Sequence, residues 1–369
     1  MCFTLKSINR VKMNTMKKFG YIIVLSIALG CSLGEKSTKS KSMNGTDTEL
    51  KSAEDMVFGF YNVENLFDTI DSKYTIDEQF LPGSEKKWNT QKYFEKINNL
   101  AKVITAFDEK ELPLFLGMAE IENKGVVLDL ITNTNLKQGN YDIVHFESPD
   151  ARGIDVSFMY RTEYFNVLSK EKIEVALSQN PNFATRDIVY VKGELKDNDV
   201  VHVFINHWSS RRSGQQESEF KRVRAATILR ERVDRILKFD EYAKIIILGD
   251  FNDYPTNKSI EQVLRAKGKP TFENGDLFNM AYSLEIADKG TYNYRGDWGM
   301  LDQMIISKGL YFAEKGMKVQ YDQCLILRED FMMYTDKKYG DQKPSKSYGG
   351  PKYYGGYSDH LPIYSRFKK

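Results

Sequence analysis

The chain has 369 residues, of which 41% are hydrophobic, so it is long enough to bury one large core or two smaller ones. Of its 53 Lys and Arg, five lie among residues 1–30, which contain no Asp or Glu, and the whole chain has 51 Asp and Glu. Residues 31–369 therefore carry a net charge of about −3, which excludes a globally basic surface for polyanions and leaves only local basic patches.

The first element is an apolar run over residues 19–29, preceded by two lysines. A run of this length is too short to span a bilayer comfortably and is typical of an export signal. Because Cys31 directly follows a glycine, residues 1–30 resemble a bacterial lipoprotein signal. We expect an exported protein of the cell envelope, periplasmic or surface-facing, anchored in the membrane by a lipid on Cys31. An uncleaved anchor helix is the alternative.

Residues 31–55 are rich in Ser, Lys, Thr and acidic residues and hold few apolar ones. This composition predicts a flexible tether between the lipid and a folded domain over residues 56–369. The chain has three cysteines, and Cys2 and Cys31 fall in or beside the signal. Cys324 then lacks a disulfide partner, and we expect it to be a small core residue.

From residue 56 onward, strand-like and helix-like patterns alternate, which predicts an α/β or α+β layered sandwich. Amphipathic helices are expected from about residue 90 to 107 and from 217 to 237. The glycine-, lysine- and tyrosine-rich stretch 334–360 has no predicted structure and is either a functional loop or a surface excursion. The predicted strands are 56–62, 112–120, 141–146, 153–160, 186–195, 200–207, 244–250, 301–307 and 361–367.

Polar side chains stand at one end of most of these strands. Some of these side chains directly follow a strand, whereas Asp302 and the pair Asp359-His360 stand at the start of a strand. Two neighbouring strands that run in opposite directions place the end of one and the start of the other at the same edge of the sheet. Each residue alone has a plain alternative, such as a turn for Asp250 and Asn252, a packed core histidine for His207 or a solvated strand end for Glu120. Together they predict one shared edge, formed by Asn62, Glu120, His207, Asp250, Asn252, Asp302, Asp359 and His360.

Carboxylates clustered in this way repel one another, so the edge requires raised pKa values or a cation. Oxygen ligands without cysteine favour Mg²⁺, Mn²⁺ or Ca²⁺ over zinc. Histidines beside such an ion suit a reaction in which negative charge develops on oxygen. Hydrolysis of a phosphoester fits: the ion polarises a phosphate oxygen, a carboxylate takes a proton from water, and an imidazolium stabilises the transition state.

Seven motifs occur in one order: FYNVENLFD, MAEIEN, RGIDVSFMYR, INHWSSRR, ILGDFND, LDQMIIS and YSDHLP. This set resembles the endonuclease/exonuclease/phosphatase family, the metal-dependent phosphoesterases related to pancreatic-type deoxyribonuclease. The phrases NVENLFD and GGYSDH resemble the branch of this family that is common in exported bacterial proteins. The resemblance covers roughly residues 55 to 369. It implies an α/β (α+β) fold, a four-layer sandwich of two mixed β-sheets flanked by helices.

The resemblance also implies a role for each matched residue. Glu120, Asn62 and Asp359 would bind the metal, most simply Mg²⁺, with Mn²⁺ or Ca²⁺ as alternatives. Asp250 would orient or deprotonate the attacking water, and Asn252 would position it. His360, oriented by Asp302, would stabilise the transition state, and His207 would contact the scissile phosphate. The residues implied to bind phosphate are Arg152, Arg211 and Arg212, and Asp155 is either the partner of His207 or an exposed acid.

The substrate is predicted less sharply than the chemistry. Lysines and tyrosines interleaved in 334–360 suit a phosphodiesterase or nuclease that acts on nucleic acid, whereas the slightly acidic domain lacks the footprint of a non-specific duplex binder. The alternatives are a phosphatase or phosphodiesterase on sugar or lipid phosphates and, in another class, a non-catalytic surface lipoprotein that binds ligands. No obligate protein partner is implied.

Overall fold

The computed structural model describes residues 56–368 except 178–179, 181–182, 196–198 and 338–339. The expected export signal, the tether and Cys31 lie outside the described residues. Within the described part of the chain, no helix is both long enough and apolar enough to cross a membrane.

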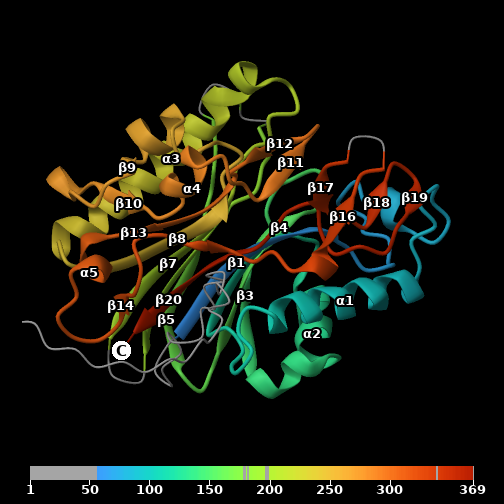
Figure 1. Cartoon of the computed structure of the whole chain (residues 1–369), viewed down its shortest axis with the longest axis horizontal. Helices are drawn as coiled ribbons and strands as arrows, with labels where there is room; N and C mark the ends of the chain where they lie inside the picture. Colours follow the sequence, from blue (N-terminus) through green and yellow to red (C-terminus); the bar gives the residue numbers. More distant parts are fainter. Residues whose placement is uncertain (1–55, 178–179, 181–182, 196–198, 338–339, 369) are drawn as a thin grey trace, which may run out of the picture. The chain divides into compact units, whose positions relative to one another are not determined.

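Two seven-stranded sheets form the centre of the domain (Figure 1). In the first, β1 (Met56–Leu66) runs parallel to β2 (Phe115–Ile121) and antiparallel to β20 (Ile363–Lys368). The strand order is β14-β20-β1-β2-β4-β3, with β15 also paired to β20. The remaining strands are β3 (Tyr141–His145), β4 (Asp155–Arg161), β14 (Lys318–Val319) and β15 (Leu325–Ile326).

The second sheet has the order β5-β6-β7-β8-β13-β10-β9. Its centre is β8 (Lys244–Asp250), which pairs in parallel with β7 (Val200–His207) and antiparallel with β13 (Asp302–Ile306). Both sheets are therefore mixed. The outer strands are β5 (Phe165–Ile173), β6 (Ile188–Leu195), β9 (Ala266–Lys267) and β10 (Leu277–Asn279).

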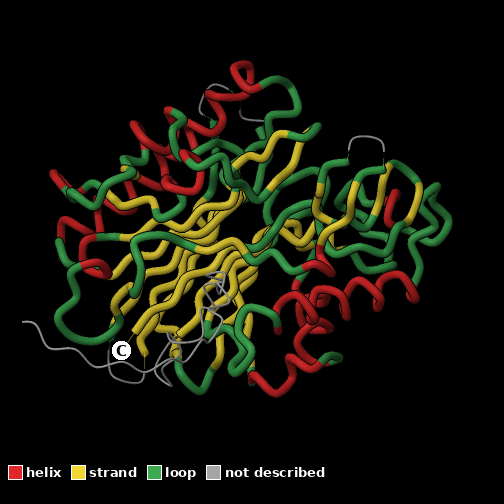
Figure 2. The backbone as a smooth tube through the Cα atoms, in the orientation of Figure 1, coloured by secondary structure: helices red, strands yellow, loops and turns green. Residues whose placement is uncertain are grey.

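The two sheets pack face to face through an apolar core. Phe58 of β1 stacks on Phe115 of β2 with ring centroids 4.3 Å apart, and this face packs with Val203 and Leu248 of the second sheet. Helices cover the outer faces (Figure 2). α1 (Thr90–Thr105) and α2 (Lys124–Thr132) pack on the first sheet, and α3 (Gln215–Phe239) packs on the second. The predicted four-layer sandwich is thus confirmed.

Both predicted helices and all nine predicted strands are present, with ends shifted by a few residues. Cys324 is fully buried in the core between the sheets, as expected. Short elements complete the domain: α4 (Tyr282–Ile286), α5 (Lys308–Tyr311), the hairpin of β11 (Tyr292–Tyr294) and β12 (Asp297–Gly299), and one-turn helices at 78–80, 135–139, 259–263, 273–275 and 330–332.

The stretch 334–360 is not without structure, which corrects the prediction. It contains most of one small hairpin, β16 (Met333–Thr335) with β17 (Gln342–Pro344), and all of another, β18 (Tyr348–Gly349) with β19 (Lys352–Tyr353). Tyr348 is buried against Trp88, with ring centroids 6.0 Å apart. Lys96 of α1 donates hydrogen bonds to Ser347 Oγ (2.8 Å) and Tyr357 O (3.2 Å). These contacts fix the stretch beside α1.

Candidate active site

Strand register brings three of the expected residues together at one edge of the second sheet. In the parallel pair β7 and β8, His207 lies opposite Asp250, and in the antiparallel pair β8 and β13, Asp250 lies opposite Asp302. Asn62 of the first sheet reaches across, because its Nδ2 donates to Asp250 Oδ2 at 3.0 Å. The edge is therefore built from both sheets.

His360 joins this group from the segment that leads into β20. Its Nδ1 lies 2.7 Å from Asp302 Oδ2, which also accepts a hydrogen bond from the Thr291 hydroxyl. The Ser358 hydroxyl donates to Asn62 O at 2.7 Å and accepts from the His360 backbone N–H at 3.1 Å. His360 is thus held in place through both its ring and its backbone.

One carboxylate oxygen lies between the two histidines. Asp250 Oδ2 is 3.7 Å from His207 Nε2 and 3.8 Å from His360 Nε2. Burial raises the pKa of Asp250 to about 6, with the charge of His360 acting in the opposite direction. A carboxyl group with this pKa is suited to exchange a proton near neutral pH.

The two imidazoles differ in charge. Burial alone would lower the pKa of His360, but the charge and hydrogen bond of Asp302 outweigh it and hold that pKa well above its ordinary value. Burial, followed by the charges of Arg186 and Arg152, holds the pKa of His207 well below its ordinary value. The edge therefore presents one imidazolium and one neutral imidazole.

Glu120 stands at the end of β2 with a left-handed backbone (φ 63°), a conformation that is unfavourable for a residue with a side chain. Its Oε2 accepts a hydrogen bond from the Asn65 backbone N–H at 2.9 Å. Burial and the charge of Asp359 raise the pKa of Glu120. A carboxylate held in a strained backbone, beside another acid, has the properties expected of a cation ligand.

The turn after β8 holds Asn252 with φ 50°. Its backbone N–H donates to Asp250 Oδ1 at 2.9 Å, and its side-chain Nδ2 donates to Trp208 O at 3.0 Å. The plain interpretation of the GDFND motif as a turn is therefore correct in part. The same turn also places Asn252 within the group of Asp250 and His207.

The residues present fit a hard divalent cation. The donor atoms of Glu120, Asn62 and Asp359 are all oxygens, which Mg²⁺, Mn²⁺ and Ca²⁺ prefer. Asp250, Asp302 and His360 also have ligand atoms within 4.8 Å of one another. In that second group, however, the Nδ1 of His360 is already bound to Asp302, so the geometry favours an oriented imidazolium over a metal ligand there.

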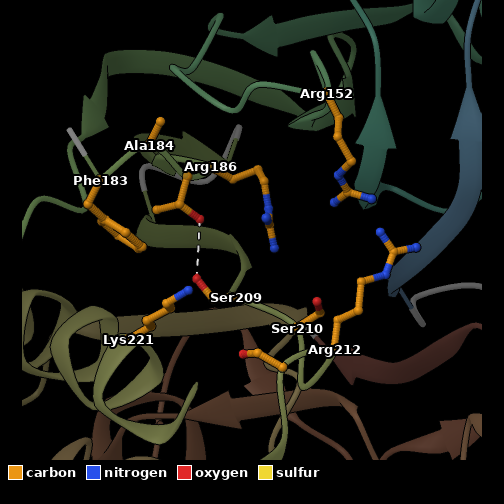
Figure 3. Close-up of a pocket in the computed structure, with 10 residues that line it drawn as sticks. Arg152, Phe183, Ala184, Arg186, Ser209, Ser210, Arg212 and Lys221 are labelled. Carbon is orange, nitrogen blue, oxygen red and sulfur yellow. Dashed lines mark hydrogen bonds between the residues drawn. The ribbon is translucent and has the colours of Figure 1, made fainter. Parts of the chain in front are cut away.

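Two of the three arginines predicted to bind phosphate line a cavity of about 380 Å³ beside His207, namely Arg152 and Arg212 (Figure 3). Arg211 points elsewhere. Its Nε donates to Asn252 O at 2.6 Å, and its guanidinium lies 4.1 Å from the ring centroid of Tyr254. Arg211 supports the turn after β8, and its contact with phosphate stays a prediction.

Asp155 is buried at the start of β4, which rules out the exposed acid. It accepts a hydrogen bond from the Ser148 N–H at 2.9 Å, and its Oδ2 lies 3.8 Å from His145 Nε2. The Nδ1 atom of His207 is buried and has no hydrogen-bond partner among the described residues. The guess that Asp155 partners His207 is thus wrong, because Asp155 faces the neighbouring strand β3.

Two residues of the site, Glu64 and Thr291, were missed from the sequence. Glu64, two residues after Asn62, is buried, and its carboxylate accepts from the Ser347 N–H at 2.6 Å. Burial and the charge of Asp359 raise the pKa of Glu64 to about 7, although Lys96 Nζ is 3.9 Å away. The acidic residue inside the motif FYNVENLFD was the available signal for Glu64. Thr291, which supports Asp302, had none.

Comparison with known proteins agrees with this geometry. The sequence model described as the endonuclease/exonuclease/phosphatase family matches residues 57–369. No curated protein matches the chain. Among solved structures, a mannosyl-6-phosphatase of Bacteroides thetaiotaomicron has a TM-score of 0.54 at 15% identity, over 85% of this chain and 100% of that one.

Two further solved structures share the fold. A humanised TDP2 of D. rerio has a TM-score of 0.52 at 14% identity, over 85% of this chain and 99% of that one. The catalytic domain of human Nocturnin has a TM-score of 0.50 at 15% identity, over 85% of this chain and 94% of that one. At such identities the likeness concerns the fold and leaves the substrate open.

Proposed function

The chain belongs to the endonuclease/exonuclease/phosphatase family, a fold of phosphoester hydrolases, and from that premise we propose that it is a Mg²⁺-dependent phosphodiesterase acting on nucleic acid. The observation that carries the proposal is the convergence of Asn62, His207 and the Asp302–His360 pair on the carboxylate of Asp250. A proton acceptor flanked by an imidazolium is what hydrolysis of a phosphoester requires.

Each residue has a stated task in this proposal. Asp250, with a pKa of about 6, accepts the proton of the attacking water, and the Asn62 and Asn252 hydrogen bonds hold its two oxygens. His360 donates a charged hydrogen bond to the phosphate as negative charge develops, and neutral His207 contacts the phosphate from the other side of Asp250. Glu120, Asn62 and Asp359 would hold a divalent cation, which would supply Lewis-acid chemistry there.

Nucleic acid is favoured over a small phosphoester by exposed aromatic and basic residues at two hairpins of the domain. Lys352 lies 5.0 Å from the ring centroid of Tyr354, which is 59% exposed, and Tyr294 on the β11–β12 hairpin is equally exposed. Exposed rings with adjacent lysines can stack bases and follow a phosphate backbone. A D. rerio TDP2 structure, similar in fold at a TM-score of 0.50, contains a single-strand DNA product.

The second candidate is a phosphatase on sugar or lipid phosphates. It is supported by the mannosyl-6-phosphatase among the structures with the same fold and by the slightly acidic domain, which suits a small substrate better than a duplex. The two candidates share the catalytic edge, which is formed by Asn62, His207, Asp250, Asp302 and His360. They differ only in what the surrounding surface binds.

One experiment separates these candidates. Purified full-length protein in detergent is incubated with single-stranded DNA, duplex DNA and a panel of phosphomonoesters, with Mg²⁺, Mn²⁺, Ca²⁺ or EDTA. Metal-dependent cutting of DNA that is lost in His360→Ala supports the nuclease. Activity confined to monoesters supports the phosphatase, and no activity on any substrate leaves a ligand-binding lipoprotein.

We also propose that the protein is exported and held at a membrane by a lipid on Cys31. The apolar run of residues 19–29 followed by Gly30-Cys31 supports this proposal. Incorporation of a labelled fatty acid in a bacterial host tests it. We expect the label in the wild-type chain and none in Cys31→Ser, and equal labelling of both would contradict the proposal.

A further inference from the structure

A cavity of about 380 Å³ lies beside the catalytic edge and is lined by four basic side chains, Arg152, Arg186, Arg212 and Lys221 (Figure 3). They come from three separate parts of the chain: the turn before β4, the segment before β6, and the stretch from the end of β7 into α3. The other lining residues are Phe183, Ala184, Thr185, Ser209, Ser210 and Ser213.

The positive charge of this cavity is only partly balanced. Arg186 is buried and pairs with Asp150 at 3.0 Å, and Arg152 lies 3.6 Å from the same carboxyl group. Arg212 and Lys221, by contrast, have no ion-pair partner among the described residues, and no carboxylate is among the described residues that line the cavity. The cavity therefore offers at least two uncompensated cations to an anion.

The other lining groups suit a phosphate. Ser209 and Thr185 present hydroxyl groups 3.4 Å apart, and Ser210 adds another hydroxyl from the turn that leads into α3. Guanidinium groups bind phosphate oxygens in pairs, and hydroxyl groups complete the shell. The ring centroid of Phe183 lies 5.7 Å from Lys221 Nζ, and this ring forms one aromatic wall of the cavity.

The cavity is joined to the catalytic edge through the backbone of the catalytic histidine. Arg186 Nε donates to His207 O at 3.2 Å, and the same guanidinium donates to Trp208 O. The Trp208 carbonyl also accepts from Asn252. A group bound in the cavity is therefore a near neighbour of the phosphate that His207 would contact.

We propose that this cavity binds a second phosphate group of the substrate, next to the phosphate that is hydrolysed. The proposal rests on the phosphoesterase function proposed above for the catalytic edge. The substrate would thus carry two neighbouring phosphates. The second phosphate could come from either of two sources: the next phosphodiester of a nucleic-acid strand, or a second phosphomonoester on a small molecule. The slightly acidic domain then needs no general basic surface, because this cavity supplies the cations locally.

The first test measures binding without catalysis. In EDTA no cation joins a phosphate to the carboxylates of the catalytic edge, so the part of pyrophosphate binding that depends on Arg212 and Lys221 reports on the cavity. Calorimetry should show binding that weakens about tenfold in Arg212→Ala and in Lys221→Ala. The matched controls are Arg235→Ala and Lys238→Ala on the exposed part of α3, which should bind like the wild type. Thermal melting checks that each variant is folded.

The second test measures turnover with the metal added. For the wild type, kcat/KM is compared between the dinucleotides pTpT and TpT, and between a sugar bisphosphate and the corresponding monophosphate. We expect the second phosphate to raise kcat/KM, and Lys221→Ala to lower that ratio about tenfold, whereas Lys238→Ala leaves it unchanged. If the kcat/KM ratio of the dinucleotides depends on Lys221, the second phosphate belongs to a nucleic-acid strand. If only the ratio of the sugar phosphates depends on Lys221, it belongs to a small molecule.

The outcomes separate the two proposals. An active enzyme whose pyrophosphate binding and substrate ratios are the same in all variants overturns the cavity and leaves the phosphoesterase in place. An inactive protein that loses pyrophosphate binding in Arg212→Ala and Lys221→Ala supports the cavity as an anion site and overturns the phosphoesterase.

Discussion

Two groups of the same residue types, one histidine with two carboxylates, lie at different places: one at the edge built from both sheets, the other in the first sheet alone. In one, Asp250, Asp302 and His360 are all buried, and in the other, His145, Glu147 and Asp155 gather at the end of β3. In both, three ligand atoms lie within 4.8 Å of one another. Composition and spacing therefore do not distinguish them.

Burial and hydrogen bonds do distinguish them. His360 is fixed by Asp302 at 2.7 Å, and its pKa is held well above the ordinary value. In the other group Glu147 is 68% exposed, and its hydrogen bond to His145 lowers the Glu147 pKa. In that group the buried acid has the strongly shifted pKa, because burial raises the pKa of Asp155 to about 8. In the first group the imidazolium is therefore fixed by a buried carboxylate, whereas the ring of His145 faces the exposed carboxylate of Glu147.

The largest expected effect comes from removing that imidazolium or the acid at the end of β2. His360→Ala and Glu120→Gln should each lower kcat by roughly 10³-fold or more, since each removes an interaction made with the transition state or with the cation. Turnover with Mg²⁺ and thermal melting measure activity and folding separately. His145→Ala is the matched control, with a loss of about threefold or less. A comparable loss in His145→Ala would make the two groups equivalent and end the distinction.

The next effect concerns the support of His360. Asp302→Asn removes the charge that raises the His360 pKa, so activity should fall by about 10²-fold. The sign of the pH effect follows: with a lower pKa the imidazolium is lost at lower pH, so the alkaline limb of the kcat profile moves toward acid. The pH profile of the variant measures this. A reduced rate with an unshifted alkaline limb would show that Asp302 acts only in folding.

A smaller effect is expected from the second group, on stability and not on turnover. The folded protein holds a proton on Asp155 up to about pH 8, whereas the unfolded chain loses it near the ordinary pKa, so folding stability falls as pH rises across that window. Asp155→Asn keeps the acceptor for the Ser148 N–H and does not titrate. Between pH 4 and 8, in EDTA, the unfolding free energy of the wild type should fall relative to the variant by about 1 kcal/mol or more. Urea unfolding at the two pH values measures this difference. An equal difference in unfolding free energy between the wild type and Asp155→Asn at pH 4 and pH 8 would contradict the prediction.

The sequence predicted that these polar residues meet at one edge, because strand ends carry that information. Asn62, His207, Asp250 and Asp302 follow from the pattern of apolar strands, since once β7, β8 and β13 pair, their ends must meet. The charge state of each histidine is harder to predict from the sequence, because it depends on burial and on neighbouring charges. That His207 is neutral and His360 charged follows from Arg186, Arg152 and Asp302, which are far apart in the sequence.

Elements whose stability depends on tertiary contacts were missed. β5 is mostly exposed and polar, so it lacks the apolar pattern of a strand and exists because it pairs with β6 along its length. α2 is only nine residues long, and its start is marked by the side chain of Asn123, which accepts from the Val126 N–H. The hairpins within 334–360 depend on Lys96 and Trp88, more than 200 residues earlier.

The smallest expected effect extends the comparison to His202, on the same strand as His207 but at its far end. Burial, followed by the charge of Lys192, lowers the pKa of His202 to about 4, and its Nδ1 is hydrogen-bonded to the Tyr190 hydroxyl at 2.8 Å. The unfolded chain binds a proton there between pH 4 and about 6.5, so folding stability rises with pH across that window. His202→Gln removes the titration. The stability of the wild type relative to this variant should then rise by about 1 kcal/mol from pH 4 to 6.5, with kcat unchanged. Urea unfolding at the two pH values measures it, and a loss of turnover in His202→Gln would show that position along β7 does not separate a structural imidazole from a catalytic one.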